Sequence, residues 1–126
     1  MRVPANARLV DWVSYTRTMP RCAAVVCHAG HGTVVRALAS GVPVVACPAA
    51  GDMAENAARV AWAGAGVSLP RRLVTPRGVR LAVERVLGEE RFAARARELG
   101  EWAARNDGGE RAARVVETFA AEAART

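Results

Sequence analysis

The segment VVCHAGHGTVVRALASGVPVVACPAAGDMAEN, residues 25–56, decides the fold. Two continuous apolar runs, residues 23–28 and 42–48, are typical of strands buried on both faces of a parallel sheet. Residues 33–40 between them have a helical pattern that Gly41 is suited to end. A strand, a helix and a second strand in this order indicate an α/β fold with a parallel sheet.

The flanking sequence continues the alternation. Residues 8–13 and 64–70 predict two further strands, residues 16–22 a short turn or helix broken before Pro20, and residues 54–63 a helix ended by Gly64. The last third predicts three helices, residues 77–87, 89–105 and 109–124, with the turn NDGG (106–109) before the third. Thr75 is the expected N-cap of the first, with Pro76 at its first position. Its core-facing residues are expected to be Val79, Ala82, Val83, Val86 and Leu87.

Length and composition narrow the class of protein. The 126 residues suit one domain, and no apolar run approaches the roughly 20 residues that span a bilayer. The N-terminus lacks a signal-peptide pattern, so we expect a cytoplasmic protein. The net charge of +6 comes from arginine alone, since the chain contains no lysine. These arginines are scattered and aromatic residues are few, which argues against a nucleic-acid partner.

The turn between the first apolar run and its helix contains the strongest site candidates. Gly30 and Gly32 allow a ligand to approach the backbone closely, and Thr33 can supply a hydroxyl. A helix N-terminus favours phosphate, to which His28 could also donate a hydrogen bond. Asp52, after the second run, could accept hydrogen bonds from sugar hydroxyls. A phosphate cradle beside a hydroxyl acceptor suggests a nucleotide-sugar ligand.

Other interpretations of these residues remain open. A glycine-rich turn can be purely structural, and Asp52 could simply cap the next helix. The dinucleotide fingerprint fails because Val35 occupies the position of its third glycine. Cys27, His28 and His31 could suggest zinc, but no second ligand pair follows at finger spacing, so we expect no metal.

The cysteines do not point to disulfides. Cys22, Cys27 and Cys47 are odd in number and have no paired spacing. Cys27 and Cys47 lie in the apolar runs, where we expect buried thiols that act as small apolar side chains.

Residues 11–13 (DWV) and 25–66 together resemble the donor-binding signature of the GT-B glycosyltransferases of the UDP-glycosyltransferase family. The resemblance covers residues 8–120 and is strongest to the bacterial branch that decorates natural products. It implies a Rossmann-like parallel sheet with flanking helices, part of the C-terminal domain that binds the nucleotide-sugar.

The resemblance also implies roles for individual residues. Trp12, a residue that without the resemblance would more often belong to the core, would stack on the nucleotide base. The diphosphate would be held by His28, Gly30, Gly32 and Thr33, and hydroxyls of the transferred sugar by Asp52. Asn56 matches the usual asparagine of the following helix, with either a structural or a ligand-binding role, and His31 would only line the site.

Three positions depart from the family pattern. Tyr15 replaces a frequent Gln, Met53 replaces a Gln beside the sugar-binding Asp, and Arg36 replaces a Glu that accepts both ribose hydroxyls. Loss of this Glu makes a dTDP-sugar as plausible as a UDP-sugar, and loss of the second Gln leaves glucose specificity open. No cofactor besides this donor substrate is implied.

By the resemblance, residues 1–126 lack the acceptor domain and the first two strands of the donor domain. The catalytic base belongs to the acceptor domain, so we expect no catalytic residue in this chain and no activity from it alone. The strand at 23–28 would then have an open edge, which residues 8–13, a second copy of the chain or a separate partner half could cover.

The sequence thus predicts the donor-binding portion of a glycosyltransferase that transfers a sugar to an acceptor hydroxyl. Two alternatives stay open. One is a non-catalytic donor-binding subunit of a split glycosyltransferase. The other is a sugar-nucleotide epimerase-like domain, for which Asp52 and Glu55 are the candidate acid and base.

Overall fold

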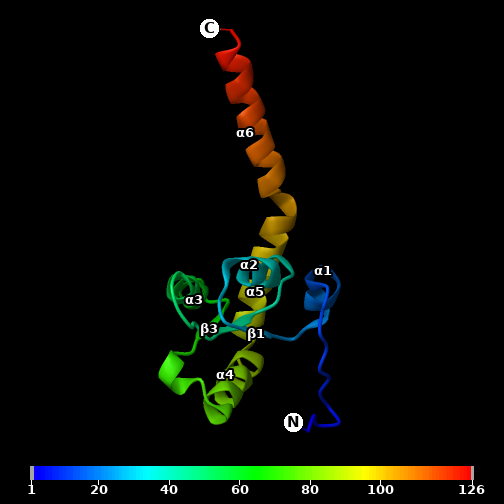
Figure 1. Cartoon of the computed structure of the whole chain (residues 1–126), viewed down its shortest axis with the longest axis vertical. Coiled ribbons are helices and arrows are strands. Elements are labelled where there is room, and N and C mark those ends of the chain that lie inside the picture. Colours follow the sequence, from blue (N-terminus) through cyan, green and yellow to red (C-terminus); the bar gives the residue numbers. More distant parts are fainter. Residues whose placement is uncertain (1, 126) are drawn as a thin grey trace.

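A computed structural model describes residues 2–125 and shows a parallel sheet between helices (Figure 1). The strands are β1 (Val25–Cys27), β2 (Val44–Ala46) and β3 (Gly66–Ser68), in the order β1-β2-β3. The helices are α1 (Tyr15–Thr18), η1 (Met19–Arg21), α2 (His31–Ala39), α3 (Met53–Trp62), η2 (Arg71–Leu73), α4 (Pro76–Gly88), α5 (Glu90–Arg105) and α6 (Gly108–Ala123). The α/β class and the parallel pairing are confirmed.

Alternate residues of β2 point to opposite faces of the sheet, and a core forms on each face. Val44 and Ala46 pack with residues of α2 and α3, including Val34 and Val60. Val45 packs on the other face with residues of α4 and α5. All three β2 residues are buried, as a central strand covered by helices on both faces requires.

The glycine and cap signals are confirmed. Gly41 and Gly64 have positive φ angles of 73° just after α2 and α3. Thr75 caps α4, where its Oγ1 accepts a hydrogen bond from the Gly78 N–H at 3.0 Å, and Pro76 is the first helical residue.

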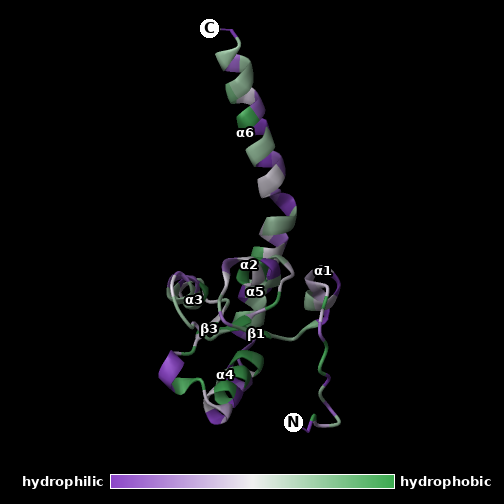
Figure 2. Ribbon diagram, viewed as in Figure 1, coloured by the Kyte–Doolittle hydropathy of each residue, from purple (hydrophilic) through white to green (hydrophobic). Residues whose placement is uncertain are grey.

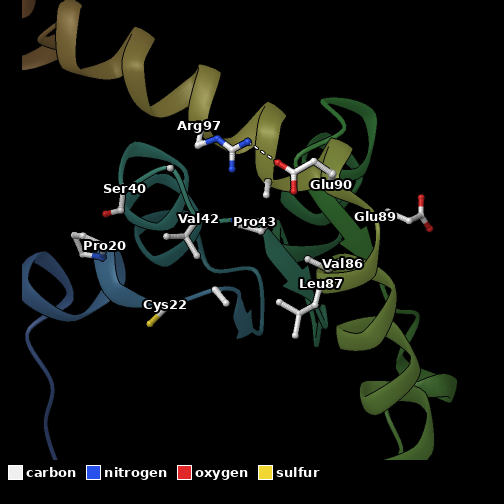
Figure 3. A pocket seen from close by; sticks show the side chains of 13 residues that line it. Pro20, Cys22, Ser40, Val42, Pro43, Val86, Leu87, Glu89, Glu90 and Arg97 are labelled. Atoms are coloured by element: carbon white, nitrogen blue, oxygen red, sulfur yellow. Dashed lines mark hydrogen bonds and ion pairs between the residues drawn. The ribbon is translucent and has the colours of Figure 1, made fainter.

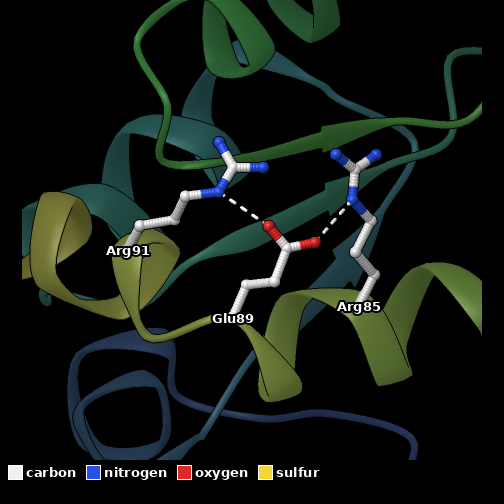
Figure 4. Close-up of polar contacts among 3 residues, drawn as sticks. All are labelled: Arg85, Glu89 and Arg91. Atoms are coloured by element: carbon white, nitrogen blue, oxygen red, sulfur yellow. Dashed lines mark hydrogen bonds and ion pairs between the residues drawn. The ribbon is translucent and has the colours of Figure 1, made fainter.

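The junction of α4 and α5 is held by a carboxylate between two guanidinium groups (Figure 4). Glu89 accepts from Arg85 Nε at 2.9 Å and from Arg91 Nε at 2.7 Å. Arg91 also lies 4.2 Å from the ring centroid of Phe92, which is buried under the sheet. The two arginines lower the pKa of Glu89 below its ordinary value of 4.5, chiefly through these hydrogen bonds.

Helix α6 extends away from the sheet (Figure 1), and all its residues are exposed. Val115, Val116 and Phe119 are exposed large apolar side chains of α6. Figure 2 shows hydrophobic segments, in green, along this helix. None of the helices within residues 2–125 is long and apolar enough to cross a membrane.

Several expectations are wrong in detail. Residues 8–13 form no strand and are exposed, because no neighbouring strand lies beside them. β1 is not buried on both faces: it is an edge strand, and Val26 is 47% exposed. Leu87 is 54% exposed, one residue beyond the core-facing Val86, and the glycines expected in a turn at 106–109 are the first residues of α6.

Candidate functional site

The turn from β1 into α2 brings His28 against the start of the helix. Ala29, between β1 and α2, is buried and has a positive φ of 66°. Gly30 follows as the N-cap of α2. A Cβ on Gly30 would lie 2.6 Å from His28 Nε2, so the imidazole packs directly over the glycine. The side chain of His28 therefore lies at the N-terminal end of α2.

The first turn of α2 offers open backbone donors. Gly30 supplies no side-chain cap, and the first main-chain bond of the helix runs from the Val34 N–H to the Gly30 oxygen. The N–H groups of His31, Gly32 and Thr33 therefore lack a partner within the helix. Apart from the adjacent residues and the backbone of α2 itself, no atom lies within 4 Å of the position of a Cβ on Gly32. Gly32 therefore places no side chain in the way of an anionic group that approaches these donors.

Asp52 and Asn56 lie at the start of α3, after β2. Asp52 occupies the N-cap position of α3, as the alternative interpretation predicted, but its side chain accepts no bond from the helix backbone. Its Oδ2 instead accepts from Asn56 Nδ2 at 3.3 Å, and the same nitrogen donates to the Ala29 oxygen at 3.1 Å. Asn56 thus connects the α3 start to the β1–α2 turn.

A second group of predicted residues surrounds a separate hollow of about 600 Å³. Trp12, Tyr15 and Arg36 line it together, although Arg36 belongs to α2 and the other two precede β1. Trp12 is 80% exposed and so has an open ring face. Among residues 2–125, those that line this hollow include none from the His28 turn. Helix α2 connects the two places, since it begins at the turn and contains Arg36.

The remaining candidates contribute little to these contacts. His31 is exposed in the first turn of α2, and Met53 is half-buried against the core below α3. Glu55, the second carboxylate that an epimerase would need, is held on the exposed side of α3 by Arg59. Cys27 and Cys47 are half-buried, and burial raises the pKa of both thiols, in line with the expected apolar role.

Another hollow, of about 460 Å³, lies at the opposite end of the sheet (Figure 3). It is lined by Ala23 and Pro43, which precede β1 and β2, and Arg97 and Glu90 form an ion pair at its rim. None of the predicted site residues lines it. In parallel sheets ligands bind beyond the carboxyl ends of the strands, so we do not assign the donor site to this hollow.

Sequence reasoning missed one feature of the site. It assigned Ala29 no role, although this residue has the backbone conformation that directs His28 toward α2. A positive φ at a non-glycine residue has no reliable sequence signal. Only the adjacent Gly30 and the matching Asn56 could have suggested it. Within residues 2–125, no three His, Cys, Asp or Glu side chains gather as metal ligands.

Comparisons with known proteins identify the family of this chain. Residues 1–118 match the family described as erythromycin biosynthesis protein CIII-like, C-terminal domain. The 4'-demethylrebeccamycin synthase of Lentzea aerocolonigenes is 43% identical over 105 residues, which are 82% of this chain and 25% of that protein.

Two solved structures extend the comparison. The calicheamicin glycosyltransferase CalG4 matches 98% of the chain and 32% of its own length, with 30% identity and a TM-score of 0.88. The glycosyltransferase VinC, solved in complex with dTDP, matches 79% of the chain and 25% of its own length, with 34% identity and a TM-score of 0.75.

The chain spans a quarter to a third of the length of these relatives. The similarity to CalG4 extends over nearly the whole chain, so the Rossmann-like fold expected from the GT-B resemblance is confirmed. The resemblance to bacterial natural-product glycosyltransferases is confirmed as well. This chain belongs to the family of erythromycin biosynthesis protein CIII-like C-terminal domains.

Proposed function

We propose that this chain is the donor-binding portion of a glycosyltransferase and binds a dTDP- or UDP-sugar. The observation that carries the proposal is the β1–α2 turn, where His28 packs over Gly30 beside the uncapped N-terminus of α2. These donors suit the diphosphate, and Asp52 suits the hydroxyls of the sugar. Trp12 offers its exposed ring to the base.

The hollow around Trp12 favours a thymidine nucleotide. Arg36 lines it, and a guanidinium group only donates hydrogen bonds. It cannot accept a bond from a ribose 2′-hydroxyl, whereas a carboxylate at this position could. The similarity to VinC, whose structure contains dTDP, supports the same preference.

In the proposed reaction, the bond between the sugar C1 and the diphosphate oxygen breaks as the acceptor oxygen bonds to C1. The acceptor proton passes to a base outside this chain, and the nucleoside diphosphate leaves with the bonding electron pair. His28 and the α2 N-terminus stabilise the negative charge that develops on the leaving phosphate. Donors fixed in this way are effective because they need no reorganisation during the reaction.

Isothermal titration calorimetry of this chain with dTDP, UDP and GDP tests the proposal. We expect dTDP to bind at least as tightly as UDP. His28→Ala should weaken dTDP binding by about 1.5–3 kcal/mol, the range for a hydrogen bond to a charged group. His31→Ala is the matched control, because His31 is exposed in the first turn of α2, and it should have a smaller effect on dTDP affinity. Absence of binding to all three nucleotides would contradict the proposal.

A further inference from the structure

We infer that Asn56 is a positioning residue that holds both His28 and Asp52 in the geometry that binds the donor. The inference rests on the proposed function, but its geometry can be tested without a ligand. Asn56 lies in the second turn of α3 and is half-buried between the two loops that contain these residues.

The orientation of the Asn56 amide follows from its neighbours. Nδ2 lies 3.1 Å from the Ala29 carbonyl oxygen and 3.3 Å from Asp52 Oδ2. A carbonyl oxygen and an ionised carboxylate only accept, so the NH₂ group and not the amide oxygen faces them. Its two hydrogens serve one acceptor each, and both bonds form in the same rotamer.

The bond to Ala29 stabilises a conformation that an L-residue rarely adopts. Ala29 has a φ of 66° and its methyl group is fully buried in the core beneath α2 and α3. The Ala29 carbonyl is part of the peptide that leads into Gly30, over which the His28 ring packs. Without the Asn56 donor this peptide can rotate, and His28 then moves relative to the N-terminus of α2.

The bond to Asp52 acts on the other part of the site. Asp52 is exposed and makes no cap bond to α3, so the Asn56 amide is its fixed contact among the described residues. One side chain therefore connects the group proposed for the diphosphate with the group proposed for the sugar. A helix residue is well suited to this role, because α3 fixes its Cα against the sheet.

A double-mutant cycle with dTDP as the probe tests the coupling to His28. We expect Asn56→Ala to weaken dTDP binding about tenfold or more. In the Asn56→Ala background, His28→Ala should then cost less than about threefold, because His28 is already displaced. Fully additive losses would overturn the positioning role. Arg59→Ala, on the exposed side of the same helix, is the control and should leave dTDP affinity unchanged.

A second measurement needs no ligand. The chain has only two histidines, so the ring resonances of His28 and His31 can be assigned by NMR. Asn56→Ala should shift the His28 resonances and leave those of His31 nearly unchanged. If the alanine variant fails to fold, the same comparison is made with Asn56→Ser, which keeps a polar group at this half-buried position.

The two measurements distinguish a failure of this inference from a failure of the proposed function. Unchanged His28 resonances in a folded Asn56 variant would overturn this inference even if dTDP binds. A wild-type chain that binds no nucleotide, but whose His28 resonances shift in the variants, would overturn the proposed function and keep the positioning role.

Discussion

Replacing Gly32 with alanine should separate folding from ligand binding at the β1–α2 turn. Gly32 is the second residue of α2, and no atom outside the adjacent residues and the backbone of α2 lies within 4 Å of the position of an added Cβ. Alanine is favoured over glycine inside a helix by about 0.5–1 kcal/mol. We therefore expect Gly32→Ala to raise the free energy of unfolding by up to this amount.

The same methyl group should weaken donor binding. It occupies the open space beside the free N–H groups of the first turn, which the proposal assigns to the diphosphate. Loss of one hydrogen bond to a charged group costs about 1.5–3 kcal/mol, equivalent to a loss of tenfold or more in dTDP affinity. Urea unfolding and calorimetry with dTDP measure the two effects on one sample.

Two further glycines serve as comparisons. Gly88 is the last residue of α4 and also has open space at the position of an added Cβ, so Gly88→Ala should leave dTDP affinity unchanged. In Gly30→Ala the new Cβ would meet His28 Nε2 at 2.6 Å and displace the ring, so binding should fall by a different route. A stable Gly32→Ala variant with unchanged dTDP affinity would refute the placement of the diphosphate at this turn.

The elements that the sequence predicts well are those whose signals are local. The continuous apolar run at β2 needs helices on both faces, and the structure places two on each. Gly41 and Gly64 end their helices because they take a left-handed conformation without steric cost. Thr75 and Pro76 define the start of α4 by a hydrogen bond within one turn.

The predictions that failed depend on distant partners. Residues 8–13 have an apolar composition typical of a strand, but a strand forms only beside another strand with which it can exchange hydrogen bonds. No such neighbour lies beside them, and they remain extended and exposed. The burial of β1 was overestimated because α4 packs mainly against β2 and β3, so the face of β1 that contains Val26 is only partly covered.

In the candidate site, too, local sequence signals were predictive, whereas contacts between distant residues were not. The glycine pattern indicated the β1–α2 turn, and the family resemblance implied roles for Trp12 and Asp52. The hydrogen bond from Asn56 to Ala29 joins residues 27 positions apart and could not be derived from spacing. Tyr15 and Arg36 line the same hollow because α1 packs against α2, and this packing could not be derived from spacing either.

Three further predictions concern packing, pH and association. Gly100→Ala should destabilise the fold by about 1–3 kcal/mol in urea unfolding. The added Cβ would lie 2.9 Å from the Gly41 nitrogen and force α2 and α5 apart. An unchanged free energy of unfolding would contradict this close packing. Arg91 and Arg85 lower the pKa of Glu89. The contribution of the Glu89 carboxylate to stability is therefore present above pH 4.5 and is lost as the pH falls through the lowered pKa. In acid unfolding, Glu89→Gln should lose less stability over this pH range than the wild type. The open edge of β1 should make the chain self-associate, because the Val26 N–H and C=O point away from β2 in a parallel ladder and the Val26 side chain is half-exposed beside them. Light scattering should show a mass that rises with concentration in the wild type and in Val26→Thr, which preserves the strand edge, and a lower mass in Val26→Lys, whose charge opposes edge-to-edge pairing. A wild-type chain that stays monomeric at every concentration would show that this edge does not drive association.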